Sequence, residues 1–136
     1  MNRFYDSEFA FLEEDLEKSL VCYIYKVYEG KNLMTDEDYK QSMRVYGEQV
    51  FTNKHTKLLV NTIHSQFSIV PALQEWTAIE IAPLTISLQR MAFVMSPDIF
   101  SQVSLEQMME EDGIAKNYSA PRYFETEEAA LKWLFE

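Results

Sequence analysis

The sequence predicts an α/β fold: a single domain over residues 1–136, with a mixed, mostly parallel β-sheet and helices packed on it. Two apolar runs, Leu58–Val60 and Ala92–Val94, lack the alternation of apolar and polar residues that marks a half-exposed strand. Such runs are typical of strands buried on both faces. A helical pattern precedes the first run and another separates the two, and crossover helices favour parallel pairing of the strands they join. We therefore expect the strands around Val60 and Phe93 to lie side by side, with helices shielding both surfaces of the sheet.

The composition supports a packed core. Hydrophobic residues make up 47% of the 136 residues and aromatic residues 14%, which makes disorder a poor interpretation. The chain has only 3 Gly and 4 Pro, too few for a flexible linker. One domain of this length buries about two-thirds of its unfolded surface.

The charge excludes several classes of partner. The net charge is −10, and the 12 basic residues are scattered along the sequence, so neither nucleic acid nor an anionic membrane surface is expected as a partner. No apolar stretch approaches the roughly 20 residues of a membrane span, so no membrane insertion is expected. Acidic residues near the start and a single cysteine, Cys22, lead us to expect a cytoplasmic protein without an intrachain disulfide.

The first third of the chain predicts two strands and a helix. Phe9 and Phe11 alternate with smaller or polar residues, and a charged turn is expected over 13–18. Leu20–Tyr28 is rich in β-branched and aromatic residues and predicts a second strand, antiparallel to the first. Thr35 with three following acids predicts a helix start, and the helix should end near Asn53. Its expected apolar stripe contains Tyr39, Met43, Tyr46, Val50 and Phe51.

The central third predicts a strand, a loop and a helix. Lys57–Ile63 is the strand, residues 64–68 form a polar loop, and Pro71 suits the first position of a helix that Pro83 closes. The expected buried face of this helix contains Ala72, Leu73, Trp76 and Ile79, and leaves Ala78 and Ile81 outside the stripe.

The last third predicts two strands and two helical segments. A strand over Arg90–Met95 is followed by a broken helical segment that starts at Ser96, restarts with a capping box at Ser104 and ends by Gly113. Arg122–Phe124 is a short strand, and Thr126 starts a terminal helix. The predicted order is β-β-α-β-α-β-α-β-α.

The residues of the last third resemble the SpoIIAA-like (STAS/SEC14-related) family. The resemblance lies in three segments: Met91–Phe100, Ser104–Glu111, and Tyr123–Leu134 with its phenylalanine, acids, alanines, tryptophan and leucine. It implies an α/β fold and either of two functions, a partner switch controlled by a phosphorylatable serine or the binding of apolar molecules.

The chain departs from the phosphorylation motif of that family. Asn61 stands where the family has an aspartate, and Val70-Pro71-Ala72 occupy the expected serine and glycine positions. Ser65 and Ser68 are nearby hydroxyls without the motif around them. The resemblance therefore implies a module without the usual phosphorylatable serine motif.

No catalytic constellation, metal site or cofactor motif is predicted. Cys22, His55 and His64 show no ligand spacing, and Cys22 lies in an apolar strand as a small core residue would. Ser65 is adjacent to His64, but adjacent residues rarely reach relay geometry, and no glycine elbow is present. The three glycines form no phosphate-binding loop.

Two groups of residues are candidate sites. The first is a partner or ligand surface at the carboxyl end of the central strand, consisting of Asn61, His64, Ser65, Gln66, Ser68 and Trp76. The alternative is that His64 and Gln66 satisfy loop amides and that Trp76 packs the following helix on the sheet. The second is an apolar lid over a cavity or a dimer surface, consisting of Phe100, Val103, Leu105, Met108 and Met109, for which ordinary core packing is the alternative.

These observations favour a non-enzymatic regulatory or protein-interaction module acting through Asn61–Trp76, with homodimer formation allowed. The alternative is a binder or carrier of a small apolar ligand, and an enzyme is a third interpretation. An interaction module should show an exposed apolar patch, expected around Ile81, whereas a carrier should show an enclosed apolar cavity.

Overall fold

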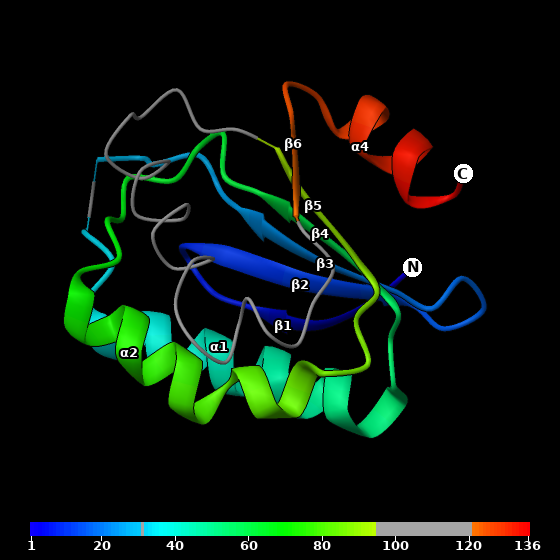
Figure 1. The fold of residues 1–136 in the computed structure, drawn as a ribbon. Helices are drawn as coiled ribbons and strands as arrows, with labels where there is room; N and C mark the ends of the chain where they lie inside the picture. Colours follow the sequence, from blue (N-terminus) through cyan, green and yellow to red (C-terminus); the bar gives the residue numbers. More distant parts are fainter. Residues whose placement is uncertain (31, 95–120) are drawn as a thin grey trace.

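The computed structural model describes residues 1–30, 32–94 and 121–136, which form a six-stranded mixed sheet with helices on both faces (Figure 1). The strands are β1 (Asn2–Asp6), β2 (Ala10–Asp15), β3 (Leu20–Tyr25), β4 (Lys57–Asn61), β5 (Arg90–Val94) and β6 (Arg122–Phe124). The helices are α1 (Asp36–Asn53), α2 (Pro71–Glu80), the 3₁₀ helix η1 (Ala82–Thr85) and α4 (Glu127–Leu134).

The sheet order follows the chain order, β1-β2-β3-β4-β5-β6. The pairs β1–β2 and β2–β3 are antiparallel, and β3, β4, β5 and β6 are parallel. Val60 pairs with Phe93 in the β4–β5 register, and both are buried. The predicted mixed, mostly parallel sheet with these two strands as neighbours is confirmed.

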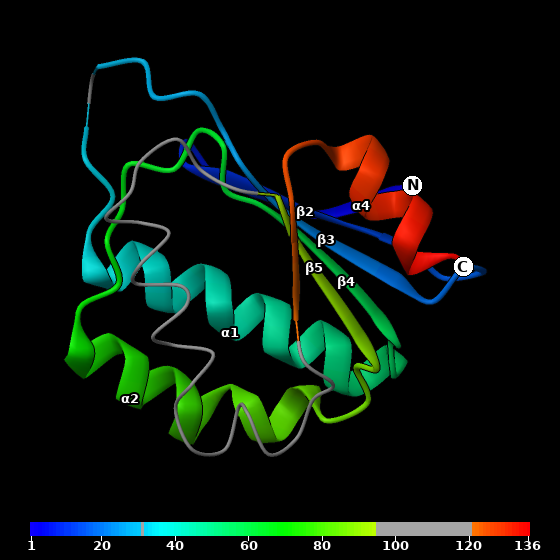
Figure 2. The ribbon, with the colours of Figure 1, turned by 45° about the horizontal axis from the view of Figure 1, so that its top comes forward.

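Helices cover the two faces unequally. α1 and α2 lie on one face, and α4 lies on the other face over β4, β5 and β6 (Figures 1 and 2). α1 and α2 share a face because each crossover moves one strand further in the same direction, and right-handed crossovers then return on the same side.

The alternation of β3 divides its side chains between two apolar clusters. Val21, Tyr23 and Tyr25 belong to the cluster under α1 and α2, and Leu20 and Cys22 belong to the cluster under α4. Burial raises the pKa of the Cys22 thiol to about 12, so this side chain is a neutral core residue.

α1 starts as predicted. The Thr35 hydroxyl accepts a hydrogen bond from the Asp38 amide at 3.2 Å, and the Asp38 carboxylate accepts one from the Thr35 amide at 2.9 Å. The expected apolar stripe is confirmed at four positions, but Phe51 is 51% exposed. Phe51 directly follows the buried Val50, and the next residue of a helix points about 100° away, toward solvent.

The predicted face of α2 is partly wrong. Leu73 is buried and Trp76 is half-buried, but Ala72 is exposed and Ile79 is 61% exposed. Ile81, where an exposed patch was expected, is only 3% exposed. The chain leaves α2 at Glu80 and turns into η1, which brings Ile81 against Gly47 of α1.

The N-terminal strands also differ from the prediction. β1 was not predicted, β2 extends to Asp15 through half of the expected turn, and β3 ends three residues before Tyr28. A bulge between Arg3 and Tyr5 interrupts the alternation of β1, which removes the period-two signal from its sequence.

A buried carboxylate explains the extension of β2. Glu14 is 2% exposed, and its two oxygens accept hydrogen bonds from four side chains. The donors are Asn2 Nδ2 at 3.3 Å, Gln49 Nε2 at 2.6 Å, Asn53 Nδ2 at 2.9 Å and His55 Nε2 at 2.9 Å. A carboxylate satisfied in this way can be buried inside a strand.

Several predictions fall on residues 95–120, outside the described residues. They are the end of the strand at Met95, the broken helical segment, and the candidate lid of Phe100, Val103, Leu105, Met108 and Met109. Across 1–30, 32–94 and 121–136, no helix combines the length and apolar character needed to cross a bilayer.

Candidate functional site

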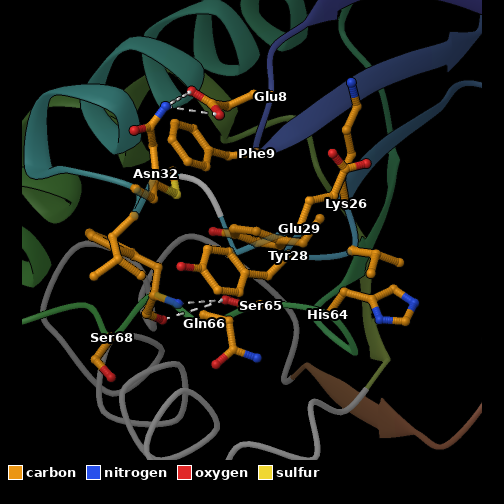
Figure 3. Close-up of a pocket in the computed structure, with 15 residues that line it drawn as sticks. Glu8, Phe9, Lys26, Tyr28, Glu29, Asn32, His64, Ser65, Gln66 and Ser68 are labelled. Carbon is orange, nitrogen blue, oxygen red and sulfur yellow. Dashed lines mark hydrogen bonds between the residues drawn. The ribbon is translucent and has the colours of Figure 1, made fainter.

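A groove of about 480 Å³ lies at the carboxyl ends of β3 and β4 (Figure 3). Its walls come from three segments: residues 8–9 before β2, residues 25–29 and 32–34 at and after the end of β3, and residues 64–68 after β4. This volume lies within the range of about 300–1,000 Å³ that is typical of ligand sites.

The topology brings these segments together. β3 and β4 are parallel, so the loops that follow them leave the sheet at the same edge. β2 runs antiparallel to β3, so the residues before β2 reach that edge as well. The Lys26 amide donates a hydrogen bond to the Phe9 carbonyl at 2.8 Å, which fixes the first segment against the second.

The groove has a buried side and an exposed apolar rim. Tyr25 is 8% exposed, and Phe67 stacks on the buried Tyr39 with ring centroids 5.4 Å apart. On the rim, Val27 is 60% exposed, Tyr28 43% and Leu33 67%. Aromatic and aliphatic walls with this rim favour contact with apolar groups of a ligand or partner.

Charged side chains of the groove have intramolecular partners. Both Glu8 carboxylate oxygens accept from Asn32 Nδ2 at 3.4 Å, as drawn in Figure 3. Lys26 forms an ion pair with Asp6, and this contact holds the pKa of the Asp6 carboxyl below its usual value. The Lys26 ammonium is therefore already paired within the chain.

Four of the six residues predicted for this surface line the groove: His64, Ser65, Gln66 and Ser68. Ser65 is 4% exposed, and its hydroxyl accepts from the Phe67 amide at 3.3 Å. Its own amide donates to the Thr62 carbonyl at 3.0 Å. Ser65 therefore shapes the loop, while His64, Gln66 and Ser68 are exposed.

Asn61 does not line the groove. It is 7% exposed, its Nδ2 donates to the Glu127 carboxylate at the start of α4, and its Oδ1 accepts from the Ile63 amide at 3.0 Å. The last position of β4 directs this side chain toward the α4 face, so Asn61 fastens α4 to the sheet.

Trp76 does not line the groove either. Its ring packs edge-on against Tyr39 with centroids 6.3 Å apart, and Lys40 and Arg44 lie over it. Trp76 thus packs α2 against α1, whereas the packing alternative expected it to hold this helix on the sheet.

Sequence reasoning missed the wall formed by residues 26–29 and 32–34. Val27 and Tyr28 were assigned to the strand before them, whereas the strand ends at Tyr25. The available signal was a group of apolar side chains near Gly30: Val27, Tyr28 and Leu33. Exposed apolar residues in a loop often mark a binding surface.

The geometry of the groove fits the binding of a partner or ligand better than catalysis. The Ser65 hydroxyl is held by the Phe67 backbone, and Figure 3 shows the His64 ring pointing away from Ser65. The two side chains therefore do not form a nucleophile–base pair. Among the described residues, no group of three or more His, Cys, Asp or Glu side chains is arranged to hold a metal ion.

Comparison of the chain with models of protein families, with curated proteins and with solved structures finds no match.

Proposed function

We propose that this chain is a non-enzymatic protein-interaction module of the SpoIIAA-like type, which recognises a partner through the groove at the carboxyl ends of β3 and β4. The observation that carries the proposal is the rim of Val27, Tyr28 and Leu33 beside a groove of about 480 Å³. An exposed apolar rim around a recess with polar groups is typical of a surface that a partner covers.

The proposal does not use a phosphorylation switch. Ser65 is buried and its hydroxyl is engaged by the loop backbone, so a kinase cannot reach it in the folded chain. Asn61, at the position of the family's aspartate, is engaged with α4. A cytoplasmic location belongs to the same proposal, and the single buried thiol of Cys22 supports it.

Charge substitution on the rim tests the proposal. Leu33→Asp and Val27→Asp place a carboxylate at the expected contact, whereas Ile86→Asp changes an equally exposed side chain at the opposite edge, before β5. The tagged full chain and each variant are used to capture proteins from lysate of the source cell. We expect a captured protein that both rim variants lose and Ile86→Asp retains, because a buried unpaired charge costs several kcal/mol. Equal capture by all variants would contradict the proposal.

The second candidate is a binder of a small apolar ligand, favoured by the volume and the aromatic walls of the same groove. Ser68→Trp fills the groove from an exposed position without touching the core. A small-ligand binder should show a higher melting temperature with members of a fatty-acid and isoprenoid panel at sub-millimolar concentration, and Ser68→Trp should abolish that increase. A flat panel for the wild-type chain would count against this candidate.

A further inference from the structure

The amino edge of the sheet gathers cations that are far apart in the sequence. Lys57 is the first residue of β4, Arg90 of β5 and Arg122 of β6. Lys57 and Arg90 are direct partners in the β4–β5 register. Because side chains alternate along a strand, Lys57 and Arg90 share the α4 face with Leu59 and Ala92.

These cations surround the C-terminal end of α4. The guanidinium carbons of Arg90 and Arg122 each lie 5.2 Å from the ring centroid of Trp133. The Nζ atoms of Lys18 and Lys57 lie 5.6 Å and 5.4 Å from the ring centroid of Phe135. Figure 2 shows this end of α4 beside the turn between β2 and β3, which carries Lys18. We call Lys18, Lys57, Arg90 and Arg122 the cationic cluster.

No carboxylate in the described part of the chain pairs with the cationic cluster. The ion pairs there are Arg3 with Asp6 and with Glu13, Lys26 with Asp6, and His55 with Glu14. Asp15 ends β2, just before the turn that carries Lys18, but its carboxylate accepts from the Lys18 backbone amide at 3.2 Å.

Packing of α4 explains only part of the cluster. Arg90 Nη1 donates to the Trp133 carbonyl, and the Lys57 ammonium donates to the Lys18 carbonyl at 2.9 Å. Cations near a helix C-terminus are favourable by about 0.3–1 kcal/mol each. Arg122 is exposed, and among the described residues its guanidinium has no hydrogen-bond acceptor. Lys57 and Arg90 are like charges directly opposite one another in neighbouring strands, and such a pair costs stability when no anion lies between them.

We propose that the cationic cluster binds a compact, multivalent oxyanion, the phosphate or diphosphate group of a small molecule. Guanidinium groups form bidentate hydrogen bonds with phosphate oxygens, and lysines add point charges. A small anion is favoured over a polyanion because the whole chain carries a net charge of −10, which repels an extended nucleic acid. The cluster lies at the edge of the sheet opposite to the groove, so it is a separate site.

Calorimetric titration of the full chain with sodium pyrophosphate, at constant ionic strength, tests the proposal. We expect saturable binding that Arg122→Gln weakens about tenfold, because hydrogen bonds to a charged group contribute about 1.5–3 kcal/mol. Lys18→Gln, in an exposed turn, should weaken binding as well. Arg44→Gln is the matched control, since Arg44 also lies over an indole ring, that of Trp76, outside the cluster.

Each contrary result has a defined meaning. No heat with pyrophosphate at millimolar concentration, while circular dichroism shows a folded chain, would overturn the proposal. If Arg44→Gln weakened binding as much as Arg122→Gln does, the binding would depend on the overall charge, and this result would also overturn the proposal. Tighter binding of a single-stranded oligonucleotide than of pyrophosphate would overturn the choice of a small anion.

Discussion

Glu14 shows how one residue can depend on distant parts of the chain. Its carboxylate is buried in β2 and accepts from side chains of β1, α1 and the segment before β4. The His55 ring donates to it through Nε2, because a carboxylate only accepts, and the buried Nδ1 then has no hydrogen-bond partner in the described part of the chain.

Removing the Glu14 carboxylate should destabilise the fold. Glu14→Ala leaves the buried His55 Nε2 and the more exposed amides of Gln49 and Asn53 without their acceptor, so we expect the free energy of unfolding to fall by about 2 kcal/mol. Glu13→Ala is the control, because Glu13 points to the other face and makes only a surface ion pair with Arg3. It should cost less than about 1 kcal/mol. Urea denaturation of the two variants measures both; equal losses would contradict the role of Glu14.

His55 should make stability depend on pH. Desolvation by burial lowers the pKa of His55 below its ordinary value of 6.5 and outweighs the attraction of the Glu14 carboxylate. The unfolded chain therefore binds more protons than the folded chain just below pH 6.5, and the free energy of unfolding falls as the pH falls through that value.

Urea denaturation between about pH 7.5 and pH 5.5 checks this dependence. His55→Gln keeps an amide donor for Glu14 but does not titrate, so its stability should fall less over this range than that of the wild-type chain. The exposed His64→Gln variant should keep the wild-type dependence. An unchanged slope in His55→Gln would show that other groups cause the decline.

Site residues were predictable only where local pattern determines them. The loop 64–68 follows a doubly buried strand, and all five of its residues line the groove, four of which belong to the predicted surface. Asn61 and Glu14 were not predictable in their roles, because Glu127 lies 66 residues from Asn61 and the α1 donors lie 35 or more residues from Glu14. Sequence spacing carries no information about contacts at that separation.

At the scale of elements, α1 depends on a glycine for its contact with η1. A Cβ at Gly47 would lie 3.0 Å from Leu84 Cδ1 and 3.5 Å from Ile81 Cγ2. The absence of a side chain at this position lets η1 approach the helix closely.

Gly47→Leu should therefore destabilise the fold although leucine favours helix. The added side chain must displace Leu84 and Ile81, and overpacking of this kind costs about 1–3 kcal/mol. Glu48→Leu, at the next and exposed position of α1, is the control and should change stability by less than about 0.5 kcal/mol. Thermal denaturation of both variants measures the difference. A higher melting temperature for Gly47→Leu would mean that helix propensity outweighs packing.

Elements with strong local signals were predicted well. Thr35 and Thr126 cap α1 and α4 as expected, because capping needs only residues within one helical turn. β1 was missed because Asn2, Arg3 and Asp6 are polar and a bulge breaks its alternation. Ile81 was misplaced because its burial depends on Gly47, in another helix.

At the scale of the molecule, the fold brings together basic residues that are far apart in the sequence. The 12 basic residues look scattered in the sequence, yet four of them gather at the amino edge of the sheet. The order and register of the parallel strands bring them together, and neither can be read from composition. The α/β class and the β4–β5 pairing, by contrast, follow from hydrophobic pattern and crossover geometry.

The net charge of −10 predicts that salt stabilises the protein. Self-repulsion is stronger in the compact state than in the unfolded state, and it is screened as the Debye length falls from about 30 Å at 0.01 M to about 8 Å at 0.15 M salt. The free energy of unfolding should therefore rise over this range of sodium chloride. A variant that neutralises two exposed acids, Glu48→Gln with Glu80→Gln, should gain less. A fall in stability on adding salt would mean that attractive pairs dominate.

The bulge in β1 also limits how two molecules can meet. β1 is the outer strand of the described sheet, and Arg3 and Asp6 place charges along it. A strand of a neighbouring molecule would need an unbroken row of amides and carbonyls to add to this border, and the bulge interrupts that row. The bulge and these charges therefore disfavour the addition of a second molecule's strand along β1.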